Sequence, residues 1–277
     1  MSSTSLISST NKEKLLTEIN RYIPKHGEKH LRILVYGPVG AGKSCFINSV
    51  ITALYGRLYI AAETRTMDTG SRSHTLKYET HQIYKDGGFS DENFPFVFND
   101  MMGMEEGDKI GVHPKDIKLV MKGHVKEGYM FNPMAPLSKD NPYYNHNPTI
   151  DDKVHVLVLM LSANCTEIDA SIIQKMKEVR ETAHSLGIPQ IAVGTHIDEQ
   201  CPEIKKNIRD TYRSRSLKIK MEEYSKAVEL SLNNIFAVKN YSEETDNNAN
   251  VDTLILIALR NMVYYGLDFV RKQKLTF

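Results

Sequence analysis

Apolar residues form two patterns that alternate along this chain. Short apolar runs, each typical of a buried strand, are separated by longer segments in which apolar residues recur at helical spacing. Strands and helices that alternate in this way assemble into a sheet covered by helices, so the pattern predicts a doubly wound, mostly parallel α/β fold with helices on both faces. The expected strands lie at 31–36, 75–84, 94–98, 154–161, 188–193 and 235–238, and the expected helices at 10–23, 46–54, 114–122, 168–186, 217–228 and 251–262.

The first expected strand leads into a glycine-rich loop and then a helix. Residues 37–44 read GPVGAGKS, a full match to the phosphate-binding pattern G-x-x-x-x-G-K-[ST]. Glycines let the backbone N–H groups of such a loop turn toward a polyphosphate, and the helix directs its positive dipole end at the same group. Lys43 is expected to bind the β- and γ-phosphates, and the Ser44 hydroxyl to bind Mg²⁺. The predicted contacts in this loop are Gly37, Val39, Gly40, Ala41, Gly42, Lys43, Ser44 and Cys45.

A second phosphate-binding signal, the sequence D-x-x-G, follows the third expected strand. Asp100 is expected to hold Mg²⁺ through a water molecule, and the Gly103 N–H to bond the γ-phosphate. An isolated D-x-x-G is a common acidic turn. This one follows a strand downstream of a complete phosphate-binding loop, which favours the functional interpretation.

The strand at 188–193 runs into the sequence GTHID, at the place where GTPases carry an Asn/Thr-Lys-x-Asp element. A carboxylate at Asp198 accepts both the N1–H and the N2 amine of guanine, a pair of donors that adenine does not present. A helix-capping role for Asp198 is the alternative. The predicted base contacts are Thr195, His196, which replaces the usual lysine, and Asp198, with Asn240 and Tyr241 from the loop after the last strand.

Composition and charge are those of an ordinary globular protein. The chain has 277 residues and is 41% hydrophobic, which is enough for a large core, and its net charge of +1 gives no bulk attraction to nucleic acid. Its three cysteines are odd in number and widely spaced, as expected of reduced thiols in the cytoplasm. The N-terminus lacks the features of a signal peptide, and no uninterrupted apolar run suggests a transmembrane segment.

The predicted organisation is a short tail followed by a single domain. Residues 1–10 are rich in serine and threonine and are expected to be disordered, and residues 11–277 are expected to form one G domain with an N-terminal helix. The segment at about 104–152 carries many glycines, prolines and aromatic residues around one short helix. A segment of this length within a compact domain predicts a functional insertion, and its aromatic residues argue against pure disorder.

Several stretches resemble the interferon-induced protein 44 family: LRILVYGPVGAGKS, FVFNDMMGMEEG, HPKDIKLVMKGHV, YMFNPM, IAVGTHID, VKNYSEE and DTLILIALRNM. The similarity runs from about residue 31 to residue 270 and includes the unusual insertion. It implies a cytosolic P-loop NTPase with a Ras-like G domain that binds guanine nucleotide and takes part in innate antiviral responses. Many members carry an N-terminal domain of the TLD type. With about thirty residues before the first strand, we expect that domain to be absent here.

The sequence predicts slow hydrolysis of GTP to GDP and phosphate. The residue after D-x-x-G, where small GTPases orient water with a glutamine, is Met104, which cannot hold a water molecule in place. The first-switch Mg²⁺ ligand should be a hydroxyl, and Thr75 is preferred over Thr66, Thr69 and Ser73. No catalytic residue is assigned. The expected ligands are GTP or GDP and Mg²⁺, and the expected partner is an unidentified protein or a second copy.

Two further functions remain open at this point. The first is an interaction scaffold in which bound nucleotide is structural and the long insertion binds partners. The second is an ATP-specific enzyme, an alternative kept open by His196 in place of lysine.

Overall fold

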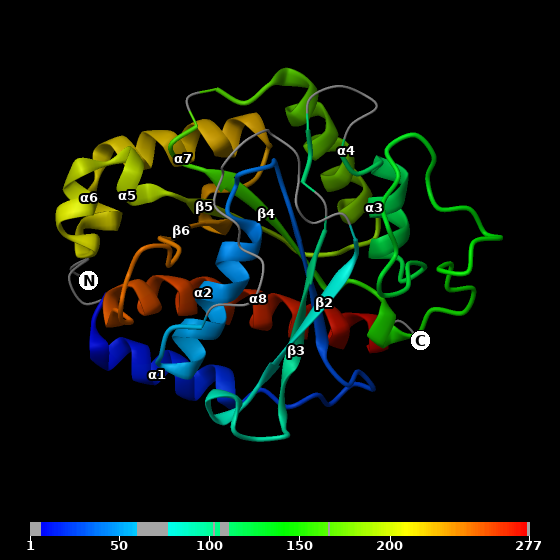
Figure 1. Cartoon of the computed structure of the whole chain (residues 1–277), viewed down its shortest axis with the longest axis horizontal. Coiled ribbons are helices and arrows are strands. Elements are labelled where there is room, and N and C mark those ends of the chain that lie inside the picture. The colour runs from blue at the N-terminus through cyan, green and yellow to red at the C-terminus, as the bar shows by residue number, and fades with distance from the viewer. Residues whose placement is uncertain (1–6, 60–76, 102, 106–110, 166, 276–277) are drawn as a thin grey trace.

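The chain folds around one six-stranded sheet flanked by helices, as a computed structural model shows (Figure 1). The structure describes residues 7–59, 77–101, 103–105, 111–165 and 167–275. The strands are β1 (Leu31–Tyr36), β2 (Glu79–Tyr84), β3 (Asn93–Asp100), β4 (Val156–Ser162), β5 (Gln190–Thr195) and β6 (Ile235–Ala237). The α-helices are α1 (Ser9–Asn20), α2 (Lys43–Tyr55), α3 (Pro114–Met121), α4 (Ala170–Ser185), α5 (Ile197–Gln200), α6 (Pro202–Lys206), α7 (Arg215–Ala227) and α8 (Ala249–Leu275). Short 3₁₀ turns are η2 (Asp86–Gly88), η3 (Ile150–Asp152), η4 (Ile208–Arg213) and η5 (Leu232–Asn234).

The strands lie in the order β2-β3-β1-β4-β5-β6, with every neighbouring pair parallel except β2 and β3. The parallel pairing places the carboxyl ends of β1, β3, β4, β5 and β6 at one edge of the sheet. Ligands of open α/β sheets bind at that edge. The predicted α/β fold with a mostly parallel sheet is therefore confirmed, and its topology is that of a Ras-like P-loop domain.

Helices cover both faces of the sheet, because successive strand residues point to opposite sides. In β1, Leu34 and Tyr36 pack with α3, α4 and α7, whereas Ile33 and Val35 pack with α1, α2 and α8. All four side chains are at most 2% exposed, so β1 is buried on both faces, as its apolar run predicts. Figure 1 shows α1 lying alongside α8 on the outside of one layer.

The N-terminal helix begins earlier than predicted. The Ser8 side chain, rather than that of Thr10, caps α1 by accepting the Asn11 N–H. Ile7 is only 2% exposed, so at Ile7 and beyond the predicted disordered tail is wrong; residues 1–6 lie outside the described part. The helix ends at Asn20, before the proline that was expected to stop it.

The last helix is much longer than the apolar stripe at 251–262 indicates. α8 has 27 residues, and among the described helices it alone is long and apolar enough to cross a membrane. The share of its apolar window buried inside the protein is 61%, which is typical of a core helix.

The described part of the insertion at 104–152 packs on the protein with three of its four Tyr and Phe side chains inward. Tyr129, Phe131 and Tyr144 are each at most 7% exposed and belong to the core that contains α3. The carboxylate of Asp116 in α3 accepts the Leu137 N–H at 2.7 Å and the Tyr129 hydroxyl at 3.3 Å. Within the described residues, the aromatic content of this segment therefore reflects local burial.

Candidate nucleotide-binding site

The glycine-rich loop connects β1 to α2 in a conformation that requires its glycines. Gly40 and Gly42 have φ of 76° and 78°, in the left-handed region. A Cβ at Gly37 would collide with the Met160 carbonyl of β4, and one at Gly42 would lie 2.7 Å from Asn240 Nδ2. The loop is thus held close to neighbouring elements, and α2 begins directly after it at Lys43.

The Lys43 ammonium lies under this loop without a carboxylate at hydrogen-bond distance among the described residues. Its Nζ donates to the carbonyls of Pro38 at 2.9 Å and Gly37 at 3.3 Å. Burial lowers the pKa of Lys43, and the charges of Asp100 and Glu105 only partly oppose this. A buried cation that meets mainly carbonyl dipoles is suited to bind an incoming anion such as phosphate.

Ser44 and Asp100 are brought together from α2 and the end of β3. The Ser44 hydroxyl donates to Asp100 Oδ2 at 2.5 Å, while Asp100 Oδ1 accepts the Met101 N–H at 2.8 Å. Among the described residues, no group of three His, Cys, Asp or Glu side chains could hold a metal ion by itself. The pair fits Mg²⁺, which commonly takes one or two protein oxygens and completes its octahedron with phosphate and water.

The D-x-x-G loop is bound to the glycine-rich loop through its backbone. Met104 N–H donates to the Gly37 carbonyl at 3.0 Å, and Val39 N–H donates to the Met104 carbonyl at 3.1 Å. A Cβ at Gly103 would lie 2.7 Å from the Val39 side chain and 3.0 Å from Lys43 Nζ. Gly103 is therefore next to the lysine that is predicted to hold the γ-phosphate. The Met104 side chain is 2% exposed and belongs to the core, which is consistent with the prediction that it positions no water.

Thr195 and His196 pack against the opposite side of the glycine-rich loop. Thr195 Oγ1 donates to the Ala41 carbonyl at 3.0 Å and so connects β5 to the loop. His196 has a left-handed backbone, with φ of 54°, and its Nδ1 lies 2.8 Å from Ser162 Oγ and 2.9 Å from Thr195 Oγ1. A Cβ at Gly42 would lie 3.4 Å from His196 Cε1, so the imidazole lies close to the loop.

The Asp198 carboxylate has a cationic partner that the sequence analysis missed. Lys239 Nζ lies 3.1 Å from Asp198 and 2.8 Å from Glu244. Burial lowers the pKa of Lys239, but the hydrogen bonds that its ammonium donates to Glu244 and Asp198 outweigh this effect, and the net pKa is raised. Lys239 directly precedes the predicted base contact Asn240, and its position in that loop is the signal that could have identified it.

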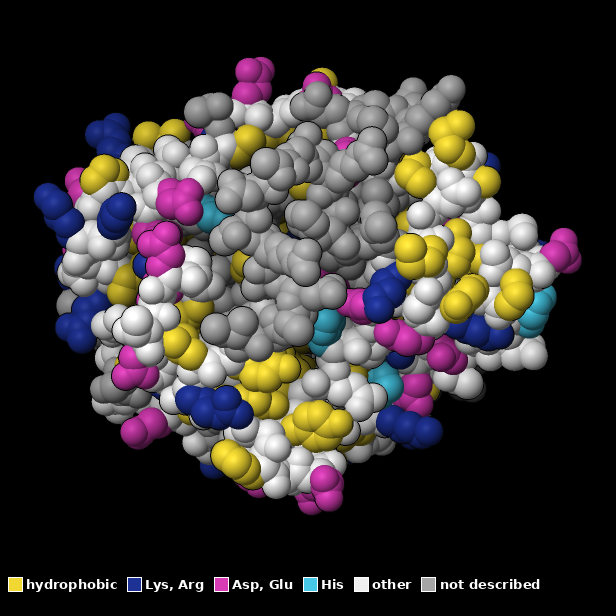
Figure 2. Space-filling model, in the orientation of Figure 1, with side chains coloured by type: hydrophobic (Ala, Val, Ile, Leu, Met, Phe, Trp, Pro, Cys, Tyr) yellow, Lys and Arg dark blue, Asp and Glu magenta, His cyan; other side chains and the backbone are white. Residues whose placement is uncertain are grey.

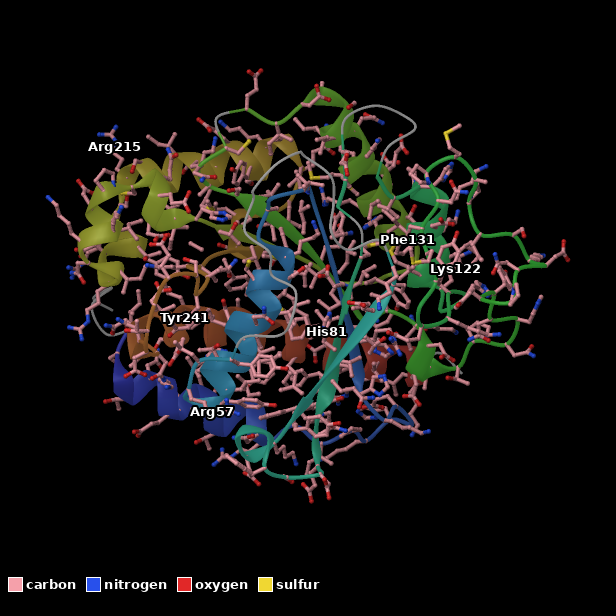
Figure 3. All side chains as sticks on the ribbon, viewed as in Figure 1. Arg57, His81, Lys122, Phe131, Arg215 and Tyr241 are labelled. Carbon is pink, nitrogen blue, oxygen red and sulfur yellow. The ribbon has the colours of Figure 1, made fainter. Side chains whose placement is uncertain are left out.

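Asn240 and Tyr241 point in different directions. Asn240 Nδ2 donates to the Gly42 carbonyl at 3.0 Å, and its Oδ1 is buried with no hydrogen-bond partner in the part of the chain that the structure describes. The Tyr241 hydroxyl donates instead to Asp252 of α8 at 2.6 Å; Figure 3 labels Tyr241. Asn240 thus offers a free acceptor beside the loop, whereas the Tyr241 phenol is turned toward α8.

Two predicted contacts have a limited structural description. Thr75 lies outside the described residues, so its role as Mg²⁺ ligand remains a prediction. Cys45 lies in the first turn of α2 with a partly buried side chain, and burial raises the pKa of its thiol. A neutral thiol has no evident role toward phosphate, so the contact predicted for Cys45 rests on its backbone.

The fold is similar to that of a known nucleotide-binding protein. Crystal structures of Toc33 from Arabidopsis thaliana superpose on 96% of this chain: a dimerization-deficient mutant with a TM-score of 0.55, and the complex with GDP and Mg²⁺ with a TM-score of 0.52. The sequence identity is 14% in both cases, so the likeness concerns the fold alone.

Sequence relatives identify the family. No protein-family model matches the chain. Interferon-induced protein 44 of Mus musculus is 31% identical over 262 residues, covering 92% of this chain and 60% of the relative. Interferon-induced protein 44 of Homo sapiens is 31% identical over 264 residues, covering 94% of this chain and 57% of the relative, and the human interferon-induced protein 44-like is 28% identical over 262 residues. The chain therefore spans 57–60% of the length of these relatives. With a similarity that includes both the phosphate-binding loop and the packed insertion, the chain belongs to the interferon-induced protein 44 family.

Proposed function

We propose that this chain is a cytosolic guanine-nucleotide switch that hydrolyses GTP slowly and acts in the innate antiviral response. One observation carries the proposal. Residues predicted to bind phosphate and residues predicted to read the base, which are far apart in the sequence, meet on the same glycine-rich loop. Lys43 would bind the phosphates in place of the loop carbonyls, and Ser44 and Asp100 would hold Mg²⁺, Asp100 through a water molecule.

The base side of this site has the polarity that guanine requires. Guanine presents two N–H donors on one edge, and Asp198 and the unpartnered Oδ1 of Asn240 are both acceptors. Adenine presents no such pair of donors to a carboxylate, so ATP would leave the Asp198 acceptors unmatched. This argument favours GTP over the ATP-specific alternative, and the flat ring of His196 would take the place of a lysine stem.

The proposal predicts that Lys43→Ala abolishes nucleotide binding. Removing this ammonium takes away the cation that balances the phosphate charges. Titration calorimetry of the Mg²⁺ complexes of GTP and ATP measures the effect and also tests the preference for guanine. Lys226→Ala, on the outer side of α7, is the matched control and should leave binding unchanged. Unchanged GTP affinity in the Lys43 variant would overturn the assignment of the loop.

The scaffold function is a second candidate, favoured by the surface of the insertion. Three apolar side chains of this segment are exposed: Met130 by 54%, Met134 by 65% and Tyr143 by 43%. Figure 2 shows hydrophobic side chains gathered over this side of the molecule. Exposed apolar residues that lie together are a common feature of protein interaction sites. In this function, bound nucleotide stabilises the fold and the insertion binds a partner, which is either another protein or a second copy of the chain.

A further inference from the structure

A cavity of about 580 Å³ lies at the opposite end of the sheet from the glycine-rich loop. Its walls come from the end of α3, from η3, from the residues that precede β4 and β5, and from the last turns of α8. Lys122, one of the lining residues, is labelled in Figure 3 on the side of the molecule where α8 ends. The volume is within the range of about 300–1,000 Å³ that is typical of small-molecule sites.

The cavity walls are largely apolar. The lining side chains include Met121, Ile150, Leu186, Ile188, Phe269 and Val270. Ile188 and Val270 are buried in the core, which holds this part of the wall in place. An occupant must therefore present a sizeable apolar body.

His155 adds one buried hydrogen-bond donor to this wall. Its side chain is 1% exposed, and its Nδ1 accepts the Arg32 N–H at 2.8 Å. The neutral ring must therefore carry its proton on Nε2, on the edge turned away from Arg32. Nε2 is buried and makes no hydrogen bond of standard geometry among the described residues, although the Ile150 carbonyl is close enough to raise the pKa of the ring slightly. Burial has the larger effect and lowers the pKa of His155 to about 4, so the ring is neutral at physiological pH.

The charged side chains that line the cavity are all lysines. Besides His155, the cavity is lined by His26, Lys122, His124, Lys153 and Lys274. No carboxylate is found among the lining residues in the part of the chain that the structure describes. The lysines give the site a positive potential that favours an anion.

We propose that this cavity binds a long-chain fatty acid. The acyl chain matches the apolar walls, and the lysines balance the carboxylate charge. A carboxylate oxygen accepts the buried Nε2–H of His155 after it displaces the groups that cover this atom. Each of the three features of the cavity is thus used by one part of the ligand. An alcohol of the same length lacks the charge, and a nucleotide lacks the apolar body.

Titration calorimetry with monomeric hexadecanoate tests the proposal. We expect one molecule to bind per chain, at least about tenfold more tightly than hexadecanol, because a charged acceptor strengthens the hydrogen bond and attracts the lysines. Equal affinity for the acid and the alcohol would overturn the proposal. Binding of phosphatidylserine vesicles without binding of monomeric hexadecanoate would overturn it too, because the ligand would then be a bilayer surface.

Variants separate this cavity from adventitious apolar binding. His155→Asn retains an acceptor for the Arg32 N–H, since its Oδ1 takes the place of Nδ1, but it lacks Nε2–H. This variant should bind hexadecanoate about tenfold more weakly and should bind hexadecanol almost as well as the wild type does. Leu186→Trp should fill the cavity and abolish binding of both, and Leu186→Phe serves if the tryptophan variant is unfolded by circular dichroism. Unchanged hexadecanoate affinity in a folded Leu186 variant would exclude the cavity.

The charge requirement has its own matched pair of variants. Lys153→Glu combined with Lys274→Glu reverses two charges at the cavity and should weaken hexadecanoate more than hexadecanol. Lys218→Glu combined with Lys226→Glu makes the same change in net charge on α7 and should have no effect. Equal effects of the two pairs would show that the cavity lysines do not recognise the carboxylate.

Discussion

Gly42 shows how a single residue connects the two halves of the candidate site. Its left-handed backbone starts α2, and its missing side chain lets Asn240 and the ring of His196 approach the loop. Its carbonyl also accepts the Asn240 side chain at 3.0 Å. Any side chain at this position would both strain the turn and push the base-side residues away.

At the same scale, Asp198→Asn should weaken GTP and improve xanthosine triphosphate. The asparagine NH₂ would face the guanine amine donor to donor, whereas xanthine has a carbonyl there that accepts it. The lost charge-assisted pair should cost about 2–4 kcal/mol, or about 30- to 1,000-fold in GTP affinity. The same substitution also removes the Asp198 carboxylate from Lys239, which keeps Glu244 as its partner.

Competition assays between GTP and xanthosine triphosphate measure the predicted change in relative affinity. Glu199→Gln is the control, because it removes a charge one residue away on the same short helix without changing the predicted base reader. If the Asp198 variant binds GTP as well as the wild type does, Asp198 only caps α5 and the guanine assignment is wrong.

At the scale of elements, a buried carboxylate joins α1, α8 and the base-side loop. Asp252 of α8 lies 2.7 Å from Lys12 Nζ of α1, accepts the Tyr241 hydroxyl at 2.6 Å and accepts Asn247 Nδ2 at 3.3 Å. Its side chain is fully buried, so these donors replace the water that its charge would otherwise bind. The packing of α1 is thereby linked to the loop that carries Asn240.

Lys12→Met should lower the free energy of unfolding much more than a substitution of an exposed lysine on the same helix. Removing one partner of a buried ion pair leaves a charge in the core, which typically costs about 3–5 kcal/mol. Lys14→Met is the control, since Lys14 is exposed on the same helix and its partner Glu18 is 3.9 Å away; it should change stability by less than about 0.5 kcal/mol. Urea unfolding measures both, and equal stability of the two variants would show that α1 is not locked by this pair.

At the scale of the whole molecule, the candidate phosphate site is connected to the insertion. Gly103 lies against Lys43, and the next residue, Met104, pairs with both Pro38 and Gly111 as isolated β-bridges. Gly111 leads into α3, whose buried face holds the aromatic residues of the insertion. A γ-phosphate that accepts the Gly103 N–H would therefore shift Gly103 and Met104. Because Met104 pairs with Gly111, which precedes α3, the shift would be passed on to α3.

A GTP-dependent switch therefore predicts different hydrogen exchange around Met104 and along α3 in the GDP complex and in the complex with a non-hydrolysable GTP analogue. Only the γ-phosphate distinguishes the two ligands, so any difference must come from its contacts. α7 should exchange identically in both and serves as the internal control. Gly103→Ala should remove the difference, because its Cβ would meet Val39 and Lys43. Identical protection around Met104 and α3 in the wild type would favour the scaffold function.

The amino-acid sequence by itself determined the alternation of strands and helices and the positions of the phosphate-binding segments. These follow from local causes: apolar spacing, the backbone freedom of glycine, and a motif whose residues are contiguous. The same causes placed the strands to within a few residues, because all of them except β2 contain a short apolar run; β2 was predicted from its alternating pattern. The start of α1 was misplaced because Ser8 and Thr10 both have side chains suited to cap a helix, and the structure has Ser8 as the cap, next to the buried Ile7.

Only the tertiary structure decided which distant residues meet. The Lys239 partner of Asp198 and the Lys12 partner of Asp252 are separated from them by 41 and 240 positions in the chain, respectively. Local sequence carries no signal for such contacts, because they depend on the packing of whole elements. The apolar cavity beside His155 is of the same kind, since its walls come from α3, η3, two strand ends and α8. The full length of α8 was also decided by packing, because burial against α1, α2 and the sheet stabilises turns whose sequence lacks a clear apolar stripe.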